Sequence, residues 1–110
     1  MPPMSETEFL TLASEALDRL EAAVEAAADA ADADIEINRT GNVLEFEFED
    51  GSKIIVNSQA PMQELWVAAK AGGFHFRHDG GQWMDTRGGG ELYGALSAYM
   101  SQQAGTTIQL

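Results

Sequence analysis

The hydrophobic period of this chain changes near residue 34, from three or four residues before that point to two residues after it. Between residues 5 and 28 the spacing is that of an amphipathic helix. Its apolar stripe consists of Phe9, Ala13, Ala16, Leu17, Leu20 and Val24. Ser5 and Glu8 have the spacing of a capping box, which predicts that the helix begins there. Residues 26–33 are rich in alanine and fit either the end of this helix or a loop.

Beyond residue 34, apolar and polar side chains alternate, as they do in strands that bury one face. The predicted strands cover residues 34–38, 44–49, 53–57, 64–70, 74–77 and 82–85. Turn signals separate them, among them residues 39–42 and the Asp50-Gly51 pair. A second helix is predicted over residues 91–103, with Leu92, Leu96, Tyr99 and Met100 on its apolar side and Gly105 at its end.

Consecutive strands joined by tight turns form an antiparallel meander, and two amphipathic helices can cover one of its faces. The predicted fold class is therefore α+β. We expect a two-layer sandwich, in which an antiparallel sheet of about six strands carries the N- and C-terminal helices on one face. At 110 residues the chain has the size of one domain, so residues 1–110 are predicted to form a single unit, with residues 1–4 disordered.

The charge restricts the partners. Eighteen acidic residues against six Lys and Arg give a formal net charge of −12, which repels nucleic acid and anionic membrane surfaces and attracts cations and basic partners. The absence of cysteine excludes disulfides and thiolate metal ligands. We see neither a signal peptide nor an apolar run long enough to cross a membrane, so the expected location is the cytoplasm.

Catalytic constellations are weak. No cysteine nucleophile and no G-x-S-x-G elbow occur in the sequence. His75 and His78 lie three apart in a strand region, where a period of two puts them on opposite faces and argues against a shared zinc ion. We therefore expect a binding protein rather than an enzyme.

Closely spaced carboxylates are the main candidate for a functional site. On the first helix they recur opposite the apolar stripe, and further acids continue into the first strand. We call this set the acidic ridge: Asp18, Glu21, Glu25, Asp29, Asp32, Asp34 and Glu36. Such oxygen ligands suit hard cations, including Mg²⁺, Ca²⁺, Mn²⁺ and iron. Because no enclosing ligand motif is present, binding is expected to be open and weak; the alternative is a solvated helix face without a ligand.

The sheet offers a second candidate surface. Trp66 alternates with Leu65 and Val67, so it faces water if those aliphatic side chains face the helices. An exposed tryptophan on an open sheet is typical of a partner contact. Asn57 and Gln59 then lie with it, and we call Asn57, Gln59 and Trp66 the sheet patch. The alternative places Trp66 in the core.

Several ordered segments resemble the frataxin family, in its bacterial CyaY type. They are Asp50-Gly51-Ser52-Lys53-Ile54-Ile55-Val56-Asn57, Gln59-x-Pro61, Leu65-Trp66-Val67-Ala68, Gly72-Gly73-Phe74-His75-Phe76, Trp83, Arg87-x-Gly89 and Gln102-Gln103-Ala104-Gly105. The resemblance covers nearly the whole chain and is looser in the first helix. It implies a sandwich of two helices on one face of a sheet, weak Fe²⁺ and Fe³⁺ binding, and a role in iron–sulfur cluster assembly as an iron donor or as a regulator of the cysteine desulfurase.

The same resemblance implies site residues and partners. It assigns iron to Glu21, Glu25, Asp32, Asp34 and Glu36, with Asp18 and Asp29 as additions of this chain, and it directs the sheet patch toward solvent. The implied partners are the cysteine desulfurase and the iron–sulfur scaffold protein. The expected state is a monomer, with iron-dependent oligomers as the alternative. The chain departs from the family by carrying alanine at four ridge positions that are often acidic: Ala22, Ala26, Ala28 and Ala30. A ferroxidase and an acidic interaction module without iron binding remain the alternative functions.

Overall fold

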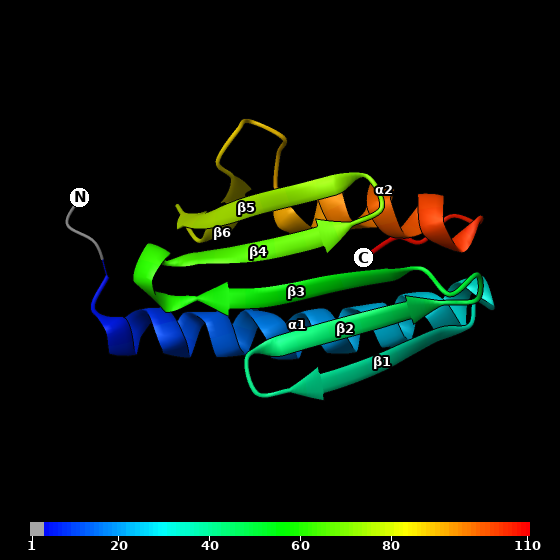
Figure 1. Ribbon diagram of the computed structural model, residues 1–110, viewed down its shortest axis with the longest axis horizontal. Helices are drawn as coiled ribbons and strands as arrows, with labels where there is room; N and C mark the ends of the chain where they lie inside the picture. Colours follow the sequence, from blue (N-terminus) through cyan, green and yellow to red (C-terminus); the bar gives the residue numbers. More distant parts are fainter. Residues whose placement is uncertain (1–3) are drawn as a thin grey trace.

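The computed structural model describes residues 4–110, which form two layers. The elements are α1 (Glu6–Ala31), β1 (Ile35–Thr40), β2 (Val43–Phe48), β3 (Lys53–Gln59), the 3₁₀ turn η1 (Ala60–Met62), β4 (Glu64–Ala69), β5 (Gly72–Asp79), β6 (Gln82–Asp85) and α2 (Leu92–Ala104). Neighbouring strands pair in chain order, each antiparallel to the next. Both helices lie behind this sheet in Figure 1. The predicted α+β sandwich is therefore confirmed.

Helix α1 begins at the predicted capping box. The Ser5 side chain accepts a hydrogen bond from the Glu8 amide, and the Glu8 side chain accepts one from the Ser5 amide. The alanine-rich stretch continues the helix to Ala31 rather than forming a loop, because alanine is the residue that favours helix most. Asp32 ends it in the left-handed conformation at φ 53°.

Helix α2 ends at Ala104 and is capped by Gly105, the residue predicted to stop it. Three strands end later than predicted. Strand β1 runs to Thr40, so the turn after it holds only Gly41 and Asn42 instead of residues 39–42. Strand β3 extends to Gln59 and β5 to Asp79, because pairing with neighbouring strands continues past the point where apolar alternation weakens.

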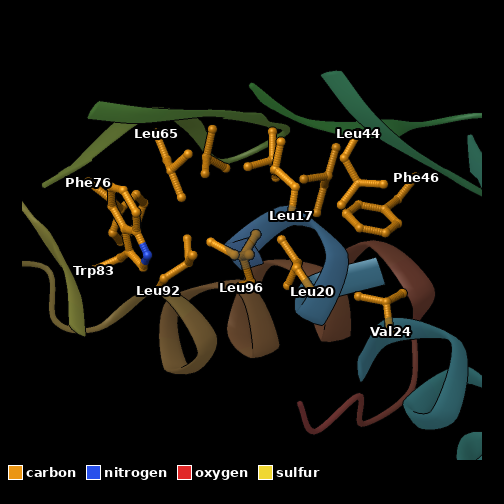
Figure 2. Close-up of a cluster of buried hydrophobic side chains, with 14 of the residues drawn as sticks. Leu17, Leu20, Val24, Leu44, Phe46, Leu65, Phe76, Trp83, Leu92 and Leu96 are labelled. Carbon is orange, nitrogen blue, oxygen red and sulfur yellow. The ribbon is translucent and has the colours of Figure 1, made fainter. Parts of the chain in front are cut away.

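The core lies between the sheet and the helices. Figure 2 shows Leu44, Phe46 and Leu65 reaching from the strands toward Leu17 and Leu20 of α1. Every member of the predicted stripe on α1 is buried, as are Leu92, Leu96 and Met100 of α2. Burial of a large apolar side chain contributes about 1.5–3 kcal/mol, so this shared interface holds the two layers together.

One buried polar side chain joins the layers as well. The Gln103 amide oxygen accepts from the Lys70 backbone amide at 3.0 Å, and its nitrogen donates to the Ser52 hydroxyl at 3.0 Å and to the Lys53 carbonyl at 3.2 Å. Gln103 therefore ties the end of α2 to the start of β3 and to the turn after β4.

The predicted disorder of residues 1–4 falls largely on residues 1–3, which lie outside the described residues. Met4 differs from the prediction. Its side chain is partly buried against the core, and its carbonyl accepts a hydrogen bond from the Gln63 side chain. These contacts hold Met4 in place ahead of α1.

Candidate functional site

Helix α1 carries four members of the acidic ridge on the side away from the core. Asp18, Glu25 and Asp29 are exposed, and Glu21 is half-buried. At about 1.5 Å per residue, Asp18 and Asp29 lie about 16 Å apart along the helix axis. One ion cannot contact both ends of this row, so the helix presents a series of carboxylates rather than one ligand set.

Arg39 neutralises part of this row. Its guanidinium lies 2.8 Å from the Asp18 carboxylate and 3.8 Å from that of Glu21, and its Nε donates to the Gly41 carbonyl at 2.7 Å. Arg39 was predicted to lie in a turn, and its contact with α1 was not predicted. The signal was present in the alternation, because Arg39 continues the helix-facing positions of Ile35 and Ile37.

The C-terminal end of α1 is more negative. Asp29, Asp32 and Asp34 are all exposed there, and the last turn of the helix holds no basic residue. The backbone carbonyls at a helix C-terminus carry a partial negative charge, which adds to that of the three carboxylates. Cations are therefore attracted to this end of the ridge without any enclosing ligand set.

Glu36 lies apart from the helical carboxylates. Strand alternation directs Ile35 and Ile37 toward the helices, so Glu36 occupies the open face of β1, directly opposite Glu47 of β2. Its grouping with the helical carboxylates in one surface stays a prediction. Glu36 belongs to an acidic strip on the sheet that also contains Glu45 and Glu47.

The donors of the acidic ridge suit iron as hard oxygen ligands, but they are spread along the surface rather than gathered around one point. Within residues 4–110, no three His, Cys, Asp or Glu side chains are arranged to hold a metal. The geometry fits hydrated cations that exchange readily along a charged surface.

The sheet patch lies on the open face of the sheet, opposite to the face that packs on the core. Asn57 of β3 and Trp66 of β4 are direct partners across two strands, and Gln59 lies opposite Glu64. Leu65 and Val67 are buried toward the helices, while Trp66 is half-buried on the open face. The predicted orientation of Trp66 is therefore confirmed, and the alternative that placed it in the core is excluded.

Three side chains missed by the sequence analysis surround Trp66. Its ring stacks on His75, with 4.5 Å between ring centres and 8° between planes. Its indole Nε1 donates to Glu64 at 3.0 Å, and Arg77 donates to the other oxygen of Glu64 at 2.7 Å. His75 and Arg77 come from the neighbouring strand β5, so their contacts become visible only once the β4–β5 register is known, whereas Glu64 lies two positions before Trp66 on β4 itself.

The two histidines lie on opposite faces of β5, as predicted. His75 stacks on Trp66 on the open face. His78 lies edge-on to the buried Trp83 ring, with 5.1 Å between the ring centres. The predicted placement of the two histidines on opposite faces is therefore confirmed.

An acidic helix end and an aromatic patch on an open sheet define the class: a small acidic α+β protein with two exposed surfaces. In the part of the chain that the structure describes, we find no helix long and apolar enough to cross a membrane.

Residues 2–106 match the model of the frataxin-like domain, and the chain belongs to the frataxin family. It is 84% identical over 110 residues to a protein of Cupriavidus metallidurans named iron-sulfur cluster assembly protein CyaY, covering 100% of this chain and 99% of the relative. A protein of the same name from Ralstonia pickettii is 68% identical, covering 100% of this chain and 97% of that relative. The resemblance to the bacterial CyaY type is thereby confirmed.

Solved structures agree with this assignment. The frataxin of Psychromonas ingrahamii superposes with a TM-score of 0.80 at 33% identity, over 96% of this chain and 97% of the other. A trimeric frataxin of Saccharomyces cerevisiae, described as complexed with ferrous, superposes with a TM-score of 0.74 over 96% of this chain and 91% of the other. The second is only 21% identical, so it supports the fold alone.

Proposed function

We propose that this chain acts in iron–sulfur cluster assembly by holding iron weakly on the acidic ridge while the sheet patch docks on the assembly machinery. The role in assembly rests on membership of the frataxin family and on the names of relatives that match the full chain. The observation that carries the iron half of the proposal is the group of exposed carboxylates at the C-terminal end of α1, where no residue of the last turn is basic.

Iron would bind mainly at Glu25, Asp29, Asp32 and Asp34. Asp18 and Glu21 contribute less, because Arg39 already offsets their charge. Glu36 contributes through the charge of the open face rather than as a ligand beside the helical carboxylates. Weak, exchangeable binding suits a protein that concentrates iron and then releases it.

The proposed partners are the cysteine desulfurase and the iron–sulfur scaffold protein, in the cytoplasm. A net charge of −12 speeds encounter with a basic partner surface and makes that encounter sensitive to salt. Trp66 supplies an aromatic contact of the kind that dominates binding energy at interfaces. We propose a monomer as the docking form, with iron-dependent oligomers as a separate state.

Two surfaces with separate tasks can be tested separately. We compare Trp66→Ala with the double variant Glu25→Gln/Asp29→Asn, and measure both Fe²⁺ binding by anaerobic calorimetry and binding to purified cysteine desulfurase. Glu6→Gln/Asp79→Asn is the control, because it removes the same charge from exposed positions outside the ridge. The expected result is loss of iron binding only in the ridge variant and loss of the salt-independent part of desulfurase binding only in Trp66→Ala. Equal iron binding in ridge and control variants would refute a specific site.

The proposal contains no catalytic step: iron is held and passed on without oxidation by the protein. Oxygen consumption per Fe²⁺ added tests this directly. Consumption by the chain equal to that of Glu25→Gln/Asp29→Asn agrees with passive binding, whereas a rate that requires these carboxylates would favour a ferroxidase.

A further inference from the structure

Glu64 is a buried carboxylate on the solvent-facing side of a sheet. Only 4% of the residue is exposed, although Trp66, two positions later on the same strand face, is reached by solvent. Burial of a glutamate is rare unless its charge is paired. The groups around Glu64 belong to the neighbourhood of Trp66, so the carboxylate and the sheet patch form one unit.

Each neighbour of Glu64 is placed by strand register. Arg77 lies directly opposite Glu64, and His75 lies directly opposite Trp66. One carboxylate oxygen accepts from the Trp66 indole at 3.0 Å and lies 3.5 Å from His75 Nδ1, while the other accepts from Arg77 at 2.7 Å. A single side chain therefore restrains an aromatic ring, the imidazole stacked on it and a guanidinium.

This arrangement does little for the core, which lies on the other face of the sheet. Its effect falls on the surface. The indole hydrogen bond fixes the rotation of the Trp66 ring, and stacking on His75 fixes its plane. Side chains ordered before binding lose less entropy at an interface than mobile ones do.

We infer that Glu64 is a positioning residue, which orders Trp66 so that the sheet patch is preformed for its protein partner. The inference rests on the proposed docking function of that patch. Glu64 acts through Trp66 and contributes no contact of its own, since its carboxylate is enclosed by the side chains that it orders.

The test is a double-mutant cycle on purified cysteine desulfurase, using Glu64→Ala, Trp66→Ala and the combined variant. Glu64→Ala is expected to weaken binding about 3- to 10-fold, the range for freeing one or two side chains. The combined variant is expected to bind no more weakly than Trp66→Ala, because Glu64 acts only through the tryptophan. Glu47→Ala is the control, since it removes a carboxylate from the same face without touching Trp66.

Glu64→Gln is included in case Glu64→Ala does not fold, because the glutamine amide oxygen can still accept a hydrogen bond from the Trp66 indole. Its affinity is expected to lie between those of the wild type and Glu64→Ala. The NMR resonance of the Trp66 indole N–H is expected to shift in the same order. Normal binding by Glu64→Ala, when Trp66→Ala binds weakly, would overturn the inference and leave the docking function intact. Additive losses in the combined variant would also overturn it. Normal binding by Trp66→Ala would overturn the docking function and the inference with it.

Discussion

The Arg39 guanidinium lies 2.8 Å from the Asp18 carboxylate and joins the edge strand β1 to helix α1 across 21 residues of sequence. The pair divides the acidic ridge into two parts. Asp18 and Glu21 face a fixed positive charge, whereas Asp29, Asp32 and Asp34 lie beyond it at the end of the helix.

Removing Arg39 should open the first part of the ridge to cations. In Arg39→Met the net charge falls from −12 to −13, and the carboxylates of Asp18 and Glu21 lose their counter-ion. Exposed ion pairs are worth about 0–1 kcal/mol, so affinity for Mn²⁺, used as a stable divalent probe, should rise by up to about fivefold in calorimetry. Lys53→Met changes the net charge equally but frees Glu45 on the open sheet face. An equal rise in both variants would mean that only overall charge matters.

Asp32 is expected to lower the stability of the fold while it contributes to cation binding. Its left-handed backbone at φ 53° and its charge at a helix C-terminus both disfavour aspartate. Asp32→Gly should raise the free energy of unfolding by about 1 kcal/mol, measured by urea titration. Both Asp32→Gly and Asp32→Asn should weaken Mn²⁺ binding, but only Asp32→Gly also removes the steric cost of a side chain in the left-handed backbone conformation. A destabilised Asp32→Gly variant would contradict this account of the helix end.

The order of elements and the core could be predicted from hydrophobic periodicity, because burial depends on which face a residue occupies. The apolar stripe of α1 and the outward direction of Trp66 follow from spacing alone. The end of α1 could not be placed, since residues 26–33 lack a strong stop signal and Asp32 supplies the left-handed cap that glycine usually provides.

Gln103 shows what periodicity leaves out. Its buried amide makes three hydrogen bonds to Ser52, Lys53 and Lys70, which are distant in sequence. Gln103→Ala should lower the free energy of unfolding by about 1–3 kcal/mol, because backbone groups lose their partners. Gln102→Ala is the matched control, since this neighbour is exposed, and it should change stability by less than about 0.5 kcal/mol. Similar melting temperatures for the two variants would contradict the proposed tie.

The candidate site was predictable in composition but not in its contacts. Spacing on α1 identified four carboxylates. Glu36 was added to them as a continuation into the first strand, and strand alternation directs its side chain to the open face. Arg39, Glu64 and Arg77 were missed because their roles depend on the packing of the β1 edge on α1 and on the β4–β5 register. Such pairings across elements leave no periodic trace in one sequence.

The most direct test of the central claim is an NMR titration of ¹⁵N-labelled protein with Fe²⁺ under anaerobic conditions. The account predicts paramagnetic broadening that begins at residues 25–34, reaches Asp18 and Glu21 only at higher iron, and spares Trp66 and its neighbours on β4 and β5. In Arg39→Met, Asp18 and Glu21 should broaden together with residues 25–34. Broadening spread evenly over all acidic surfaces, or centred on the sheet patch, would contradict an iron site on the acidic ridge.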